Sequence, residues 1–189
     1  MSVLGLTPLL LGLVLFSTQL QAVEEPEGYR TELYDDVVPD SLQGATRVSA
    51  IDVKKLMQEI DALVVDVIPE HRRPDFLPEG QLWIPVPHKG LPGALWLPDV
   101  GFGVLSEVTE KYFTTHLQSA TDGNLNHPMV FYCRQDCWMS WNAAKRALTY
   151  GYTQVYWFAD GVDDWAFEDY EFENLIAAPG TRQETELIK

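Results

Sequence analysis

Runs rich in apolar or β-branched residues alternate with segments of helical periodicity along most of this chain. Such runs predict strands, and they lie at residues 45–49, 63–67, 94–98, 129–133 and 154–158. Apolar spacing, capping residues and good helix formers predict helices near residues 49–60, 106–119, 140–149 and 160–172. Strands separated by helices require crossover connections, so the pattern predicts an α/β fold with a mostly parallel sheet.

The remaining segments divide the chain. We interpret residues 1–22 as a signal peptide, 23–44 as an irregular acidic N-terminal arm that packs on the domain, 45–175 as the domain and 176–189 as a C-terminal tail. Prolines between residues 69 and 78 predict a break in regular structure after the second strand.

The predicted signal peptide indicates the compartment of the protein, and the compartment determines whether a disulfide persists. Residues 1–22 carry no charged side chain and contain the apolar run 9–16 ahead of Glu24. This is typical of a secretory signal cleaved after Ala22, and no later stretch is apolar enough to span a bilayer. We therefore expect export to a bacterial periplasm, where disulfides persist, and no stable membrane span after cleavage.

The formal net charge of -15 falls entirely on the part that follows the leader. Nucleic-acid binding draws most of its affinity from cationic side chains, so this composition argues against a nucleic-acid partner. The acidity disfavours attraction of small anions and favours encounter with a basic partner. Solubility alone also accounts for it, and composition leaves the two explanations open.

The only two cysteines of the chain, Cys133 and Cys137, lie in the segment VFYCRQDCWMSWNAAKRAL, residues 130–148. Cys133 ends a predicted strand just ahead of a predicted helix. Ligands of open parallel sheets bind beyond the carboxyl ends of the strands, and the amide groups and dipole of a helix start favour a thiolate over a thiol. Cys133 is therefore placed to act as a nucleophile.

Four segments fall in the order and spacing of a rhodanese domain and cover roughly residues 45–172: LVVDV at 63–67, LPGALWLP at 91–98, the pair Cys133 and Arg134, and DGVDDW at 160–165. The chain therefore resembles rhodanese-like proteins. Its DCWMSWNAAKR segment resembles the family named for a CXXCW motif and associated with PQQ-dependent alcohol catabolism, although the spacing here is CXXXCW. The resemblance implies an open, mostly parallel α/β sheet with helices on both faces, Cys133 in the active-site loop, and a link to PQQ-dependent alcohol oxidation.

The loop departs from the rhodanese pattern. Such a loop holds an anionic sulfur donor with a basic residue, small residues including glycine, and a closing arginine. Here Asp136 stands where glycine is usual, Trp138 stands near the expected arginine, and Ile68 replaces the arginine that usually follows the DV strand. These changes predict weakened thiosulfate binding.

The predicted site centres on the two thiols. We assign catalytic or supporting roles to Cys133, Cys137, Arg134 and Asp66, and substrate contact to Gln135, Asp136, Trp138 and Met139. Asp66 is expected to support the neighbouring loop through hydrogen bonds. Among the aromatic residues, Trp138 and Trp141 are interpreted as an apolar lid or partner surface, and Trp157 and Trp165 as core. Lys145 and Arg146 are expected on the helix surface.

Three interpretations of the cysteine pair stay open. Cys133 accepts sulfur or electrons from a small sulfur compound or a partner-protein thiol, and Cys137 resolves the product by closing a disulfide. Alternatively the pair is an inert disulfide, which stabilises little across so short a loop. As a third interpretation, the thiolates bind copper together with His88 or His127, because soft ligands select copper. We assign no resident cofactor, while another redox cofactor stays open as copper does. Covalent haem attachment is not expected, since the sequence contains no CxxCH.

Two classes of function follow from these observations. The first is a sulfurtransferase or thiol-disulfide oxidoreductase linked to PQQ-dependent alcohol catabolism. The competing class is a noncatalytic accessory or metal- or cofactor-binding module for a periplasmic quinoprotein dehydrogenase or cytochrome c.

Overall fold

The computed structural model describes residues 23–180 of the chain. The predicted signal peptide and residues 181–189 of the predicted tail lie outside this range. Within it, no helix is both long and apolar enough to cross a membrane.

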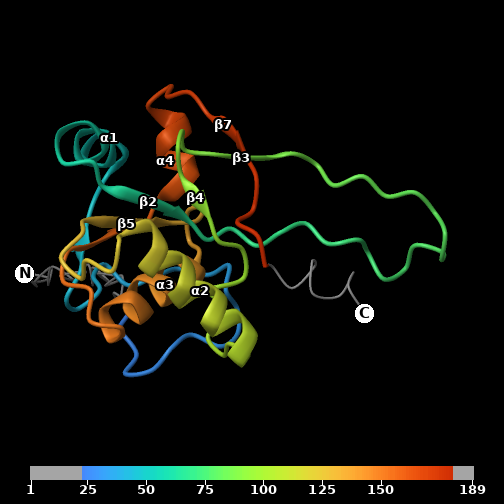
Figure 1. Cartoon of the computed structure of the whole chain (residues 1–189), viewed down its shortest axis with the longest axis horizontal. Coiled ribbons are helices and arrows are strands. Elements are labelled where there is room, and N and C mark those ends of the chain that lie inside the picture. The colour runs from blue at the N-terminus through green and yellow to red at the C-terminus, as the bar shows by residue number, and fades with distance from the viewer. Residues whose placement is uncertain (1–22, 181–189) are drawn as a thin grey trace, which may run out of the picture.

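A five-stranded parallel sheet in the order β1-β6-β5-β2-β4 forms the centre of the fold (Figure 1). Its strands are β1 Thr46–Arg47, β2 Leu63–Asp66, β4 Leu95–Trp96, β5 Met129–Tyr132 and β6 Val155–Phe158. The middle strand β5 is buried along its whole length, as expected of a parallel sheet covered on both faces. The predicted α/β fold with a mostly parallel sheet is confirmed.

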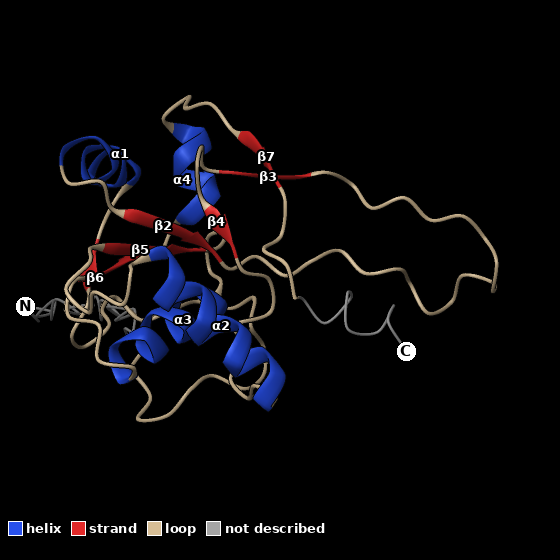
Figure 2. Cartoon of the chain, viewed as in Figure 1, coloured by secondary structure: helices blue, strands red, loops and turns tan. Residues whose placement is uncertain are grey.

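The helices cover both faces of this sheet: α1 and α4 lie on one face, and α2 and α3 on the other (Figure 2). Their bounds are α1 Ala50–Glu59, α2 Glu107–Ala120, α3 Trp138–Thr149 and α4 Gly161–Phe167. Helix α1 begins after Ser49 because the Ser49 hydroxyl accepts the Asp52 N–H at 3.3 Å and the Asp52 carboxylate accepts the Ser49 N–H at 3.1 Å. This reciprocal pair is a capping box.

Successive residues of β5 enter opposite cores, as the two-residue period of a strand requires. Val130 and Tyr132 pack with α1 and α4, whereas Met129 and Phe131 pack with α2 and α3. The predicted core roles of Trp157 and Trp165 are confirmed: each side chain is buried, one in each core. The loop that follows β5 is therefore held by a strand that is fixed from both sides.

A second, two-stranded antiparallel sheet was not predicted. It joins β3 His88–Gly90 to β7 Glu173–Leu175. Strands of three residues give no alternation to detect, and this pairing joins segments that are far apart in sequence. Helix α4 also ends at Phe167, short of the predicted 172, because the chain turns there toward β7.

Two irregular segments leave the sheet. Residues 23–44, the arm, run beside α2 and α3, and residues 67–87 extend away from the domain between β2 and β3 (Figure 1). The second segment contains the prolines that predicted a break in regular structure. It carries a group of exposed apolar side chains, namely Phe76, Leu82, Ile84 and Val86.

Candidate functional site: a buried disulfide beneath the arm

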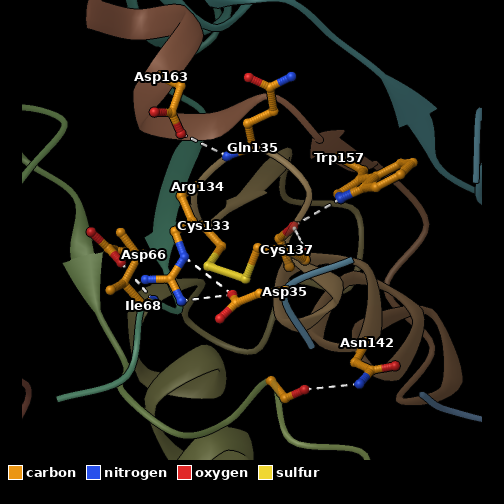
Figure 3. Close-up of a disulfide and its surroundings, with 12 residues drawn as sticks. Asp35, Asp66, Ile68, Cys133, Arg134, Gln135, Cys137, Asn142, Trp157 and Asp163 are labelled. Atoms are coloured by element: carbon orange, nitrogen blue, oxygen red, sulfur yellow. Dashed lines mark hydrogen bonds and ion pairs between the residues drawn. A yellow bond between two sulfur atoms is a disulfide. The ribbon is translucent and has the colours of Figure 1, made fainter. Parts of the chain in front are cut away.

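Cys133 and Cys137 form a disulfide in the loop between β5 and α3 (Figure 3). Their Cα atoms lie 6.2 Å apart, within the range that a disulfide spans. Cys133 follows the last residue of β5, and Cys137 is the N-cap of α3. The side chains are 0% and 1% exposed, although the three residues between them are exposed.

The loop reverses direction at Asp136, whose φ of 52° lies in the left-handed region. Glycine adopts this conformation without strain, and aspartate is among the few other residues that do so readily. The sequence therefore departs from the usual glycine while the backbone keeps the conformation that favours glycine.

Helix α4 holds the loop from one side. The Val162 N–H donates to the Cys133 carbonyl at 3.0 Å, and the Gln135 N–H donates to the Asp163 carboxylate at 2.8 Å. Gly161 has a φ of 52°, and a Cβ there would overlap the Cys133 carbonyl oxygen. Only glycine satisfies both conditions without displacing the loop.

The arm holds the loop from the other side. The Asp36 N–H donates to the Asp136 carbonyl at 2.9 Å, and the Trp138 N–H donates to the Tyr34 carbonyl at 2.8 Å. These two bonds form an antiparallel bridge that sets Asp35 opposite Cys137. The Asp35 carboxylate accepts from the Arg134 guanidinium at 2.6 and 3.2 Å. The arm therefore engages both the backbone and the cation of the loop.

Helix α3 fastens the arm with one row of side chains. Asn142 accepts the Arg30 N–H at 2.9 Å and donates to the Arg30 carbonyl at 2.8 Å, so its amide pairs with that peptide as a neighbouring strand would. The Trp138 and Trp141 indoles donate to the Val37 and Ser41 carbonyls, and Lys145 donates to the Pro26 and Glu27 carbonyls. Positions 138, 141, 142 and 145 follow the spacing of one helix face. That spacing of hydrogen-bonding side chains is the signal in the sequence that marks the helix face toward the arm.

Several predicted roles on α3 need correction. Trp138 and Trp141 are 2% and 0% exposed, so they anchor the arm and do not form an open partner surface. Met139, assigned with Trp138 to substrate contact, is likewise buried in the core. Arg146 does not lie on the helix surface. Its side chain is buried and donates to the Val100, Phe102 and Gly103 carbonyls. Burial lowers its pKa.

The loop is also supported from within the core. The Trp157 indole donates to the Ser140 hydroxyl at 3.0 Å, and that hydroxyl donates to the Cys137 carbonyl at 3.2 Å. A fully buried strand residue thus fixes the position of the second cysteine through α3.

Asp66 joins three strands at the carboxyl end of β2. One of its oxygens accepts the Ile68 N–H at 2.8 Å, which is the hydrogen bond to the neighbouring loop that we expected. The other accepts the Tyr132 hydroxyl at 2.6 Å and contacts His88 Nε2 at 2.8 Å. Burial, together with the adjacent Asp66 carboxylate, raises the pKa of Tyr132 well above its ordinary value. Asp66 thus supports Tyr132, the residue that precedes Cys133.

The structure brings five predicted site residues into one loop: Cys133, Arg134, Gln135, Asp136 and Cys137. The two histidines proposed as copper ligands lie outside that loop. His88 stacks on Trp96 at 4.0 Å and bonds to Asp66, and His127 precedes β5 and so lies at the opposite end of that strand from Cys133. Among residues 23–180, no group of three or more metal-binding side chains lies together.

Residues 49–168 match the model of the rhodanese-like domain. A thiosulfate sulfurtransferase from Pseudomonas aeruginosa aligns at 16% identity and a TM-score of 0.47, covering 70% of this chain and only 21% of that one. A polysulfide-sulfur transferase homodimer from Wolinella succinogenes aligns at 20% identity and a TM-score of 0.42, covering 70% and 80%. A rhodanese-like domain from Anabaena aligns at 14% identity and a TM-score of 0.44, covering 71% and 82%. No curated protein matches the chain in sequence. Because the family match extends over more than half of its length, the chain belongs to the rhodanese-like domain family.

Proposed function

We propose that this is an exported thiol-active protein in which Cys133 and Cys137 cycle between disulfide and dithiol, carrying electrons or sulfur in support of PQQ-dependent alcohol catabolism. The observation that carries the proposal is the pairing of both cysteines within one loop, at the carboxyl end of the central strand. This is the edge of a parallel sheet at which ligands bind. Membership of the rhodanese-like family supports sulfur chemistry at the same loop.

The two sulfur atoms have different roles in this proposal. Cys137 is the N-cap of α3, and the dipole of a helix favours negative charge at its N-terminus by roughly 0.3–1 kcal/mol. Cys137 is therefore the better leaving group when a thiolate attacks the disulfide. The incoming thiolate of a partner protein or small thiol bonds to Cys133 Sγ, the disulfide breaks, and its electron pair leaves on Cys137. A second thiolate then attacks the incoming sulfur, which leaves Cys133 reduced and the donor oxidised to a disulfide.

Sulfur transfer starts from the reduced pair. The Cys133 thiolate attacks the outer sulfur of a donor such as thiosulfate, forms a persulfide and releases sulfite. The Cys137 thiolate then attacks Cys133 Sγ, which restores the disulfide and releases the outer sulfur as hydrosulfide. Each cycle of sulfur transfer consumes two electrons. The thiols that reduce the disulfide in the exchange described above supply them.

Intact mass spectrometry of protein purified from periplasm tests this proposal. The sample is measured as isolated and after reduction, with and without thiosulfate, and with thiol alkylation at each stage. We expect cleavage after Ala22 and two alkylation sites that appear only after reduction. In the wild type thiosulfate should release hydrosulfide and restore the disulfide, so an added sulfur should accumulate only where Cys137 is absent.

Cys133→Ser and Cys137→Ser serve as the paired variants. Cys133→Ser should gain no sulfur, whereas Cys137→Ser should keep the persulfide because it lacks the resolving thiol. Equal sulfur uptake by Cys137→Ser and Cys133→Ser would contradict the assigned nucleophile. A disulfide that resists every reductant in the folded protein would leave only a structural role for the pair.

The pathway is tested separately in cells. A strain without this protein should lose growth on alcohols that a PQQ-dependent dehydrogenase oxidises. Growth should return with the wild type and not with Cys133→Ser. Full recovery by the serine variant would disconnect the thiols from the pathway.

A further inference from the structure

The Asp35 carboxylate pairs with the only cationic side chain of the disulfide loop. Arg134 is the single basic residue between Cys133 and Cys137, and its guanidinium directs both Nε and Nη2 at one oxygen of Asp35 (Figure 3). An anionic sulfur donor would need this guanidinium to offset its charge. In the present arrangement the donor has to compete with a carboxylate of the same chain.

The backbone of the arm fixes Asp35 in this position. The residues before and after it, Tyr34 and Asp36, are the ones that bond to the loop backbone, so Asp35 lies directly opposite Cys137. The disulfide beneath is almost fully buried. The side chains of Arg134 and Asp35 are 49% and 68% exposed, so a reagent that reaches this part of the loop from solvent meets their ion pair.

We propose that Asp35 is a specificity-determining residue, which slows the reaction of small anionic thiols and sulfur donors at this cysteine pair relative to neutral or cationic ones. This inference rests on the proposed function, because it concerns which reagents react at the same disulfide. It accounts for a rhodanese-like loop in which the cation is kept but is already paired.

The test compares thiols of similar size and different charge on the mature protein: 2-mercaptoethanol, 2-mercaptoethanesulfonate and cysteamine. Each reduces the disulfide by the two-step exchange described above, in which the reagent is oxidised and both cysteines are reduced. Rates are followed by quenched alkylation and mass spectrometry. The readout is the ratio of the anionic to the neutral rate, compared between variants so that the intrinsic reactivity of each reagent cancels.

Asp35→Asn should raise the anionic-to-neutral ratio about fivefold, the size expected for one solvent-accessible charge near the reaction, and should lower the preference for cysteamine. Asp36→Asn is the matched control, because it removes the same charge from the next residue, which pairs with Arg30 at 3.0 Å and not with Arg134. It should change the ratio less than about twofold. Asp35→Glu, which keeps the negative charge, should keep the wild-type ratio.

Each outcome decides a different question. An equal rise of all three rates in Asp35→Asn would show that the residue only fastens the arm, and this would overturn the specificity role. Equal ratios in Asp35→Asn and Asp36→Asn would overturn it as well, since any arm charge would then suffice. If no thiol reduces the wild type or any of the three variants, the proposed function itself fails and the inference fails with it.

Discussion

Replacing Asn142 with alanine removes the side chain that fastens the arm to α3. The fully buried Asn142 amide makes three hydrogen bonds, two to the Arg30 peptide and one to the Gly101 carbonyl at 2.9 Å. At about 1 kcal/mol for each bond, the variant should lose about 3 kcal/mol in free energy of unfolding.

Two of these three bonds join the arm, so local opening of the arm should become easier by about 2 kcal/mol. If the disulfide is reduced faster while the Arg30 part of the arm is open, its reduction by dithiothreitol should accelerate by up to roughly 30-fold. Urea unfolding of the oxidised protein measures the first quantity, and quenched alkylation under native conditions measures the second.

The control is Asn174→Ala, a change at an exposed position of β7 that should alter stability by less than about 0.5 kcal/mol. A loss of about 3 kcal/mol in Asn142→Ala with no change in reduction rate would refute the idea that the arm shields the disulfide. A loss below about 1 kcal/mol would refute the value assigned to the hydrogen bonds.

Three further predictions concern the loop and its surroundings. In single-cysteine variants, Cys137 should be alkylated about two- to fivefold faster than Cys133 at neutral pH, because it caps α3. Faster alkylation of Cys133 would contradict the proposal that Cys137 is the leaving group when a thiolate attacks the disulfide. Gly161→Ala should lower the free energy of unfolding in urea by about 2–3 kcal/mol, since its Cβ would meet the Cys133 carbonyl. The control Gly123→Ala, which has a similar φ of 70° and open space around the Cβ, should lower it by about 1 kcal/mol. Equal losses in the two variants would exclude a contribution from the loop contact. The raised pKa of Tyr132 means that the unfolded chain releases this proton first, near its ordinary value of 10.0, so this contribution to stability is complete below pH 10 and is lost as pH rises above it. Tyr132→Phe should flatten the fall in stability above pH 10, and an unchanged slope would contradict the assignment.

Local patterns predicted the parallel sheet and the position of the cysteine loop. The apolar runs at residues 63–67 and 129–133 are strands because burial on both faces requires a continuous apolar sequence, and this is visible within five residues. The same runs fix where the strands end, and therefore which edge of the sheet carries the cysteines.

The sequence alone determined that two thiols stand in one short loop after a buried strand. Only the tertiary structure decided that the arm covers them, because Asp35 and Arg134 are 99 residues apart and an exposed ion pair leaves no periodic pattern at either position. The antiparallel pairing of β3 with β7 and the burial of Arg146 also depend on distant segments, because their hydrogen-bond partners are backbone groups. Every residue carries backbone donors or acceptors, so the sequence does not show which of them will be the partner.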